Sequence, residues 1–142
     1  MYNMMDVLAS GLSTARTRMN VVASNIANAQ TTRTEEGGPY KRRDVVVYAK
    51  EETSGFSSLL DRMTLHKPMV AGVVEDKAPA RLVYEPNHPD ADENGNVAYP
   101  NINVVASMTE LMTISRLYQA NATALETAKR MNQDARRIST TA

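Results

Sequence analysis

The chain has 142 residues, no cysteine, and sixteen basic residues that balance sixteen acidic ones. This balance, without a long run of one sign, argues against nucleic acid as a partner, and the lack of cysteine excludes disulfides, thiolate metal sites and a cysteine nucleophile. There is no tryptophan and one phenylalanine, so large core side chains are scarce and we expect an elongated shape with thin helix contacts.

The N-terminal segment predicts a long helix. Its first residues lack the basic start and the apolar run of a signal peptide, and no stretch of the chain is apolar enough for membrane insertion. Apolar residues then recur at steps of three and four, which is an a/d heptad pattern typical of helices that pack along a seam. These residues are Met5, Leu8, Leu12, Ala15, Met19, Val22 and Ile26, followed by Ala29.

The middle of the chain carries strand and turn signals. Residues 44–48 form a β-branched run, and residues 70–74 and 81–84 flank a turn-rich segment as the two arms of a hairpin would. We expect a small sheet of two to four strands. Residues 85–101 contain three prolines and read as an extended connector with a turn at Asn94-Gly95. The segment 51–67 is ambiguous, because Leu59, Leu60 and Met63 allow one short helix.

A second amphipathic helix is predicted from about Asn103 onward, where Pro100 and two asparagines supply a start signal. Its apolar positions again recur at steps of three or four. They are Leu111, Ile114, Tyr118, Ala122, Leu125, Ala128 and Ile138, with Met131 and Ala135 between the last two.

The remaining faces of both helices carry small, mostly uncharged residues such as alanine, serine and threonine. A solvated helix usually alternates Glu and Lys, so these faces favour helices packed on several sides, although an ordinary small bundle is the alternative. The predicted fold is mainly α, with the terminal helices forming an antiparallel, coiled-coil-like pair and a small β insertion and extended connector between them. Residues 1–32 and 103–142 would form one helical domain, and residues 33–102 a small β-rich part.

One loop has residues that suggest chemistry. Asp90, Asp92, Asn94 and Gly95 resemble the first half of a calcium loop, but the twelfth position is Asn101 instead of a carboxylate, so an Asx turn is the preferred interpretation. His88 beside two aspartates allows a small hydrolase or metal-dependent enzyme as a remote alternative. No nucleophile motif accompanies it, and we predict no enzyme, metal or cofactor.

Three stretches resemble the flagellar basal-body rod protein family, most closely its proximal rod members. The first is the run Ser24-Asn25-Ile26-Ala27-Asn28-Ala29 with its continuation to Tyr40, the second is His88-Pro89-Asp90-Ala91-Asp92 with Tyr99-Pro100-Asn101, and the third is Ser115 to Asn121. The matched motif positions are Asn25, Asn28, Thr31, Thr32, Arg33, Gly37, Gly38, Pro39, Tyr40, His88, Pro89, Asp90, Asp92, Tyr99, Pro100, Asn101, Arg116, Gln119 and Asn121.

The resemblance implies a structural subunit of the rod, the periplasm-spanning part of the basal body. Its partners would be copies of itself, other flagellar rod proteins and, in transit, the flagellar type III export apparatus, which needs no cleaved signal peptide. Polar residues of the motifs, among them Asn25, Asn28 and Asn121, would fix the register of packed helices, or else face water or the connector. A coiled-coil adaptor or export chaperone, which would form a soluble dimer, is the alternative function.

Overall fold

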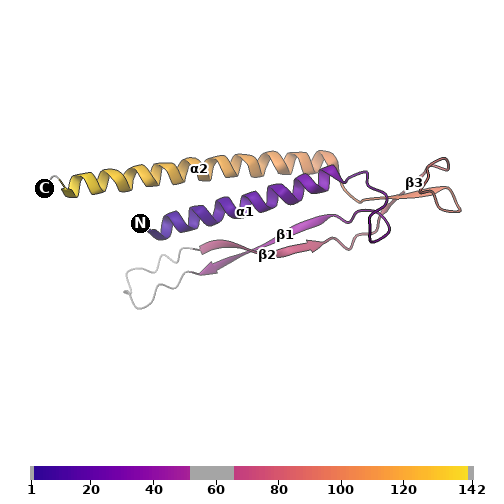
Figure 1. Cartoon of the computed structure of the whole chain (residues 1–142), viewed down its shortest axis with the longest axis horizontal. Helices are drawn as coiled ribbons and strands as arrows, with labels where there is room; N and C mark the ends of the chain where they lie inside the picture. The colour runs from indigo at the N-terminus through magenta and orange to yellow at the C-terminus, as the bar shows by residue number, and fades with distance from the viewer. Residues whose placement is uncertain (1, 52–65, 141–142) are drawn as a thin grey trace.

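Two long helices dominate the structure, a computed structural model that describes residues 2–51 and 66–140. Helix α1 comprises Tyr2–Ala27 and helix α2 Val104–Thr140, and the two run antiparallel to one another (Figure 1). The predicted start of the second helix is confirmed, because the side-chain Oδ1 of Asn103 accepts a hydrogen bond from the Ala106 amide at 3.0 Å, as an N-cap residue does.

The strands form two separate antiparallel pairs. Strand β1, Arg43–Glu51, pairs with β2, His66–Glu75, and β3, Arg81–Tyr84, pairs with β4, Asn96–Tyr99. Arg43 lies opposite Glu75 and Lys50 opposite Lys67, with an irregularity in register between Val46 and Val47. The predicted hairpin between residues 70–74 and 81–84 is therefore wrong, since β2 and β3 pair with other strands. The possible helix at Leu59, Leu60 and Met63 lies outside the described residues.

The connector contains a strand that the sequence pattern did not reveal. The sequence predicts an extended connector over residues 85–101. Residues 96–99 of it form β4 and pair with β3 from Arg81↔Tyr99 to Tyr84↔Asn96. The predicted turn at Asn94-Gly95 is confirmed, because Gly95 has a φ of 77°. Asp92 holds this turn as an Asx residue, since its Oδ1 accepts hydrogen bonds from the amides of Asn94 and Asn96 at 2.9 and 2.8 Å.

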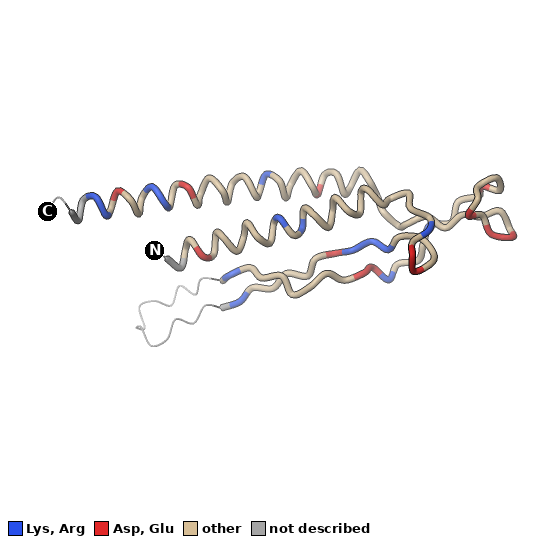
Figure 2. The backbone as a smooth tube through the Cα atoms, in the orientation of Figure 1, with Lys and Arg blue, Asp and Glu red and all other residues tan. Residues whose placement is uncertain are grey.

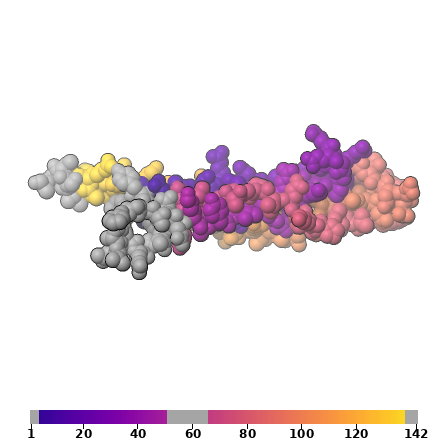
Figure 3. Space-filling view, turned by 90° about the horizontal axis from the view of Figure 1, so that it is seen from below, coloured from indigo at the N-terminus to yellow at the C-terminus, as the bar shows by residue number. Residues whose placement is uncertain are grey.

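The molecule is a long, thin assembly of layers, as the composition predicted (Figures 1 and 3). Helix α1 lies in the middle and contacts α2 on one side and the β1–β2 hairpin on the other. The β3–β4 hairpin projects at the end where α1 finishes and α2 begins. No helix in the described part of the chain is long and apolar enough to cross a membrane.

The apolar core is correspondingly small. Between the helices, Ala15, Val22 and Ile114 are buried and pack together, with partly buried apolar side chains of both helices around them. In the β3–β4 hairpin, Val97 of β4 is fully buried. Many large apolar side chains are instead exposed, on α2 and on the β1–β2 hairpin.

Candidate assembly interface

The apolar residues predicted along the two helices form one stripe on each, and these stripes meet at the α1–α2 seam. The residues that pack together there are Ala15, Met19, Val22, Ile26, Leu111 and Ile114. Ala15, Val22, Ile114 and Ala128 are buried, and the structure leaves Met5, Leu8, Leu12, Met19, Ile26, Leu111, Ala122 and Leu125 half-buried. Tyr118 is 36 % exposed, and Met131 is 58 % exposed. The side chain of Ile138 lies outside the described part of the chain.

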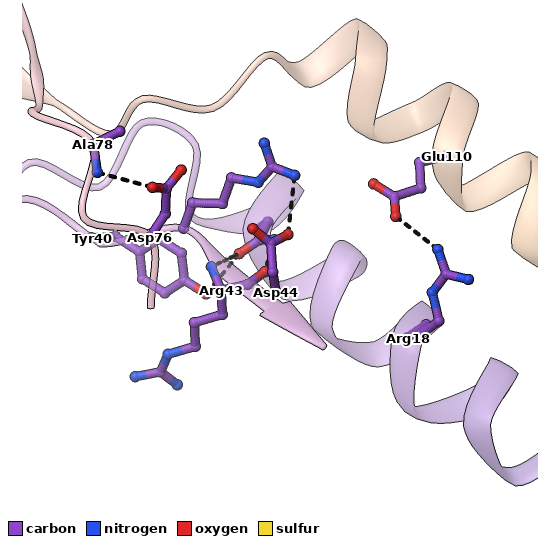
Figure 4. A network of polar contacts seen from close by, with 9 residues as sticks. Arg18, Tyr40, Arg43, Asp44, Asp76, Ala78 and Glu110 are labelled. Atoms are coloured by element: carbon purple, nitrogen blue, oxygen red, sulfur yellow. Dashed lines mark hydrogen bonds and ion pairs between the residues drawn. The ribbon is translucent and has the colours of Figure 1, made fainter. Parts of the chain in front are cut away.

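Two polar features fix how the helices lie against one another. A Cβ atom added to Gly11 would lie 3.1 Å from the Asn121 Nδ2 atom, so the side chain of this motif asparagine rests on the backbone of α1. Farther along, Arg18 forms an ion pair with Glu110 at 3.3 Å between half-exposed side chains (Figure 4). Charge is otherwise sparse on the central part of both helices (Figure 2).

The other side of α1 binds the β1–β2 hairpin through small hydroxyl residues. Ser10 and Thr14 both donate hydrogen bonds to the main-chain carbonyl of Pro68 in β2. Thr14 is buried although it is polar. A two-stranded hairpin is only marginally stable alone, so these contacts with α1 are what hold β1 and β2 in place. The predicted stripe did not include these residues, because serine and threonine carry no periodic apolar signal.

The end of α1 is tied to the start of β1 by the motif residue Asn25, which is 3 % exposed. Its Nδ2 donates to the Arg43 carbonyl at 2.7 Å, and its Oδ1 accepts from the Arg43 amide at 2.9 Å and from the Tyr40 hydroxyl at 3.2 Å. The Arg43 guanidinium also lies over the Tyr40 ring, 5.8 Å from its centroid. Figure 4 shows Tyr40 and Arg43 side by side at this junction.

Asn28 and the following threonines order the loop of residues 28–42. The Asn28 Nδ2 donates to the Ser24 carbonyl at 2.9 Å, and its Oδ1 accepts from the Thr31 hydroxyl at 3.2 Å. The Tyr40 amide donates to the Thr31 carbonyl at 3.0 Å. Gly37 and Gly38 make the turn with φ values of 85° and 77°, which side-chain-bearing residues rarely adopt. The motif residue Pro39 follows this turn and is half-buried.

The loop is joined to the connector through Asp90. Its carboxylate accepts a hydrogen bond from the Thr32 hydroxyl at 2.8 Å and lies 3.9 Å from the Arg33 guanidinium. Both aspartates of the calcium-like loop thus bind groups of this chain. Asp92 accepts from main-chain amides of its own turn, and Asp90 accepts from Thr32 in the loop of residues 28–42. Among the residues that the structure describes, no three His, Asp or Glu side chains are placed to hold a metal ion.

Tyr99 and Glu85 join the two strands of the β3–β4 hairpin. The Tyr99 hydroxyl donates to Glu85 Oε2 at 3.0 Å. This hydrogen bond, with smaller effects of desolvation and of the nearby Glu85 charge, raises the pKa of Tyr99 above its usual value of 10.0, while Arg81 lowers it. The neighbouring motif residue Pro100 is buried, and Asn101 beside it is exposed.

The outer face of α2 carries a feature that the predicted stripe missed. Val105, Met108 and Met112 are 74, 50 and 60 % exposed. Their spacing of three and four residues places them on one face, and a step of two residues from Met112 to Ile114 turns about 200° around the helix, so this face is opposite the seam. The motif residues Arg116 and Gln119 are exposed on the same helix.

Comparison with known proteins decides the family. A model described as "Flagella basal body rod protein" matches residues 5–33, and one described as "Flagellar basal body rod FlgEFG protein C-terminal" matches residues 93–138. The chain is 40 % identical over 133 residues to "Flagellar basal-body rod protein FlgC" of Salmonella typhimurium, covering 91 % of this chain and 90 % of that protein. The chain belongs to the FlgC family of flagellar basal-body rod proteins.

Other FlgC proteins match over the same extent. Identity is 36 % over 140 residues to FlgC of Bacillus subtilis, covering 92 % of both chains, and 33 % over 144 residues to FlgC of Borreliella burgdorferi, covering 95 % of both. The chain is thus a structural subunit of the flagellar basal-body rod, as the motifs predicted. The two family models, over residues 5–33 and 93–138, include parts of both helices that form the α1–α2 seam.

Proposed function

We propose that the chain polymerises into the rod through its terminal helices, and that the exposed apolar face of α2 contacts a neighbouring subunit there. The observation that carries the proposal is the position of Val105, Met108 and Met112 opposite the α1–α2 seam, at 50 to 74 % exposure. Burying such side chains contributes about 25 cal/mol per Å² of apolar surface, so a neighbour on this face would gain stability.

The same proposal includes an arrangement for the assembled subunit. Residues 1–32 and 103–142 would form the helical axial core, with a heptad-like α1–α2 pair, and residues 33–102 would lie outside it. Contacts between unlike surfaces, repeated along an axis, generate an open filament instead of a closed ring. The β1–β2 hairpin packs along α1, so this outer part would follow the helical core over much of its length.

We also propose the binding partners of the subunit and the route by which it is exported. The subunit would bind copies of itself and other rod proteins in the periplasm-spanning rod, and would reach it through the flagellar type III export apparatus without a cleaved signal peptide. Membership of the FlgC family supports these partners and this route.

The test separates folding of the chain from its assembly. In a strain lacking the gene, Met112→Glu should fold with a free energy of unfolding within about 0.5 kcal/mol of the wild type, because exposed positions tolerate substitution. It should nevertheless be missing from purified basal bodies and fail to restore motility. Lys77→Glu, an exposed change in the turn after β2, serves as the control and should restore both.

Ile114→Ala should instead impair folding, since Ile114 is 2 % exposed in the seam. Truncation there should lower the free energy of unfolding by about 2–4 kcal/mol.

Full motility and normal incorporation of Met112→Glu would show that the outer face of α2 is no subunit contact.

A further inference from the structure

The turn between β3 and β4 contains a histidine whose bonding depends on its protonation state. The Asp90 amide donates a hydrogen bond to the His88 Nδ1 atom at 3.1 Å. The main chain of the turn is hydrogen-bonded as well. The His88 amide donates to the main-chain carbonyl of Glu85, and the Ala91 amide donates to the main-chain carbonyl of His88, both at 3.1 Å. His88 is half-buried, and its ring meets the Tyr99 ring edge-on with centroids 6.3 Å apart.

A ring nitrogen that accepts a hydrogen bond carries no proton. The His88 imidazole is therefore neutral in this arrangement, with its proton on Nε2. When the ring gains a second proton, Nδ1 becomes a donor, and two donors then face one another at the Asp90 amide. Protonation of His88 is incompatible with this hydrogen bond.

Asp90, which His88 holds in this way, links the β3–β4 turn to the loop of residues 28–42. The Asp90 carboxylate accepts from the Thr32 hydroxyl at 2.8 Å and pairs with Arg33 at 3.9 Å. Its amide is fixed by His88 on one side, while its carboxylate holds the loop of residues 28–42 on the other. A change at His88 thus acts on the contact between the β3–β4 turn and the loop that follows α1.

The charged groups around His88 define what a protonated ring would meet. Glu85 and Asp90 belong to the same turn, Tyr99 lies on β4, and Arg81 of β3 lies over the Tyr99 ring at 5.9 Å. From the loop, Arg33 pairs with Asp90. In the structure both carboxylates already accept hydrogen bonds, Glu85 from the Tyr99 hydroxyl and Asp90 from the Thr32 hydroxyl. A protonated His88 ring can no longer accept the bond from the Asp90 amide.

We propose that His88 acts as a latch controlled by its own protonation. The neutral ring holds Asp90 so that the β3–β4 turn docks on the loop of residues 28–42, and protonation of the ring releases this contact. The latch is closed while the ring is neutral, because Nδ1 then accepts from the Asp90 amide, and it opens when the ring takes up a second proton. The proposal rests on the geometry of the turn and does not depend on assembly of the chain into the rod.

Nuclear magnetic resonance of the full-length chain tests the latch directly. At pH 8 the ¹⁵N shifts of the His88 ring should show an unprotonated Nδ1 and a protonated Nε2. During acidification the Asp90 amide and Thr32 signals should move together with the His88 ring. The chain has two histidines, and His66 is exposed, so its titration in the same sample should leave the Asp90 amide unaffected.

A proteolysis experiment measures the opening. Cleavage after Glu93 by a glutamate-specific protease should be about fivefold slower in the wild type than in His88→Ala at pH 8, the factor expected for one net hydrogen bond. The two rates should converge at pH 5.5, and His66→Ala should behave as the wild type at both values. The proposal is overturned if Nδ1 carries the proton at pH 8, if the Asp90 amide ignores the His88 titration, or if the rate ratio does not change with pH.

Discussion

The carboxamide of Asn25 takes the place of a peptide group at the start of β1. It both donates to the Arg43 carbonyl and accepts from the Arg43 amide, which is the double exchange that two residues make in a hydrogen-bonded pair of antiparallel strands. Main-chain groups in the interior must find partners, and here a helix side chain supplies them. Asn25 thus couples the last turns of α1 to the hairpin.

Replacing Asn25 by alanine should lower the free energy of unfolding by about 2–3 kcal/mol, because Arg43 loses the partners of its amide and carbonyl. Urea denaturation followed by circular dichroism measures the change. Asn20→Ala is the matched control, since Asn20 is exposed on the same helix, and should change stability little. Equal stability of the two variants would contradict this role of Asn25.

Tyr99 gives a pH dependence whose sign follows from its raised pKa. The folded chain holds the phenol proton more tightly than the unfolded chain, because the hydroxyl donates to Glu85. The stabilisation is fully present below about pH 10 and is lost as the pH rises through the higher folded value. Tyrosinate absorbance of the wild type minus Tyr99→Phe should show Tyr99 ionising above the ordinary value, and Glu85→Gln should bring it down. An ordinary or lower value in the wild type would refute the assignment.

Among the elements, the two helices are in close contact where Gly11 meets Asn121, with 3.1 Å between the Asn121 side-chain nitrogen and a Cβ built on Gly11. Alanine is favoured over glycine in a helix by about 1 kcal/mol, but here it presses on the asparagine. Gly11→Ala should therefore change the stability of the wild type by less than about 0.5 kcal/mol, yet stabilise Asn121→Ala by about 1 kcal/mol. A double-mutant cycle by urea denaturation measures the difference, and purely additive effects would rule out the contact.

The helices were predictable because their signals are local. Apolar spacing identified both of them, and Asn103 marked the start of α2 through a bond to the Ala106 amide three residues away. Strand partners are not local. The run at residues 70–74 has the same β-branched character whichever strand it joins, and it pairs with β1 across the segment 52–65 instead of with β3. Strand β4 is as short as β3, but it lies between Gly95 and Pro100 in the connector, where the turn signals conceal it.

For the site, the sequence identified the motif residues but not what they bind. The sequence predicts that Asn25 and Asn28 either fix the register of packed helices or face water or the connector. The bonds described for them go to β1, to the loop and to their own helix. Asn121 does lie between the helices, against Gly11. The exposed face with Met108 and Met112 had a readable spacing of four residues. The apolar periodicity that predicts α2 follows one face of the helix and therefore does not include these two residues.

At the scale of the whole molecule, the layered arrangement makes a long particle with little core (Figure 3). A dilute sample should sediment as a monomer of 15.6 kDa and more slowly than a sphere of that mass. Light scattering after size exclusion gives the mass independently, and a globular protein of equal mass is the control. A stable dimer of defined mass would contradict the expected monomer.

The small core also determines how stability varies with temperature. In the free chain Val97 is the largest side chain that is fully buried among the described residues, so unfolding exposes little new apolar surface. The heat capacity of unfolding, usually about 12–15 cal/mol/K per residue, scales with that surface. A low value flattens the stability curve, so the free subunit resists cold and heat over a broad range with only a modest maximum of stability. If neighbours cover the exposed faces as proposed, the assembled subunit would gain the curvature that the free chain lacks.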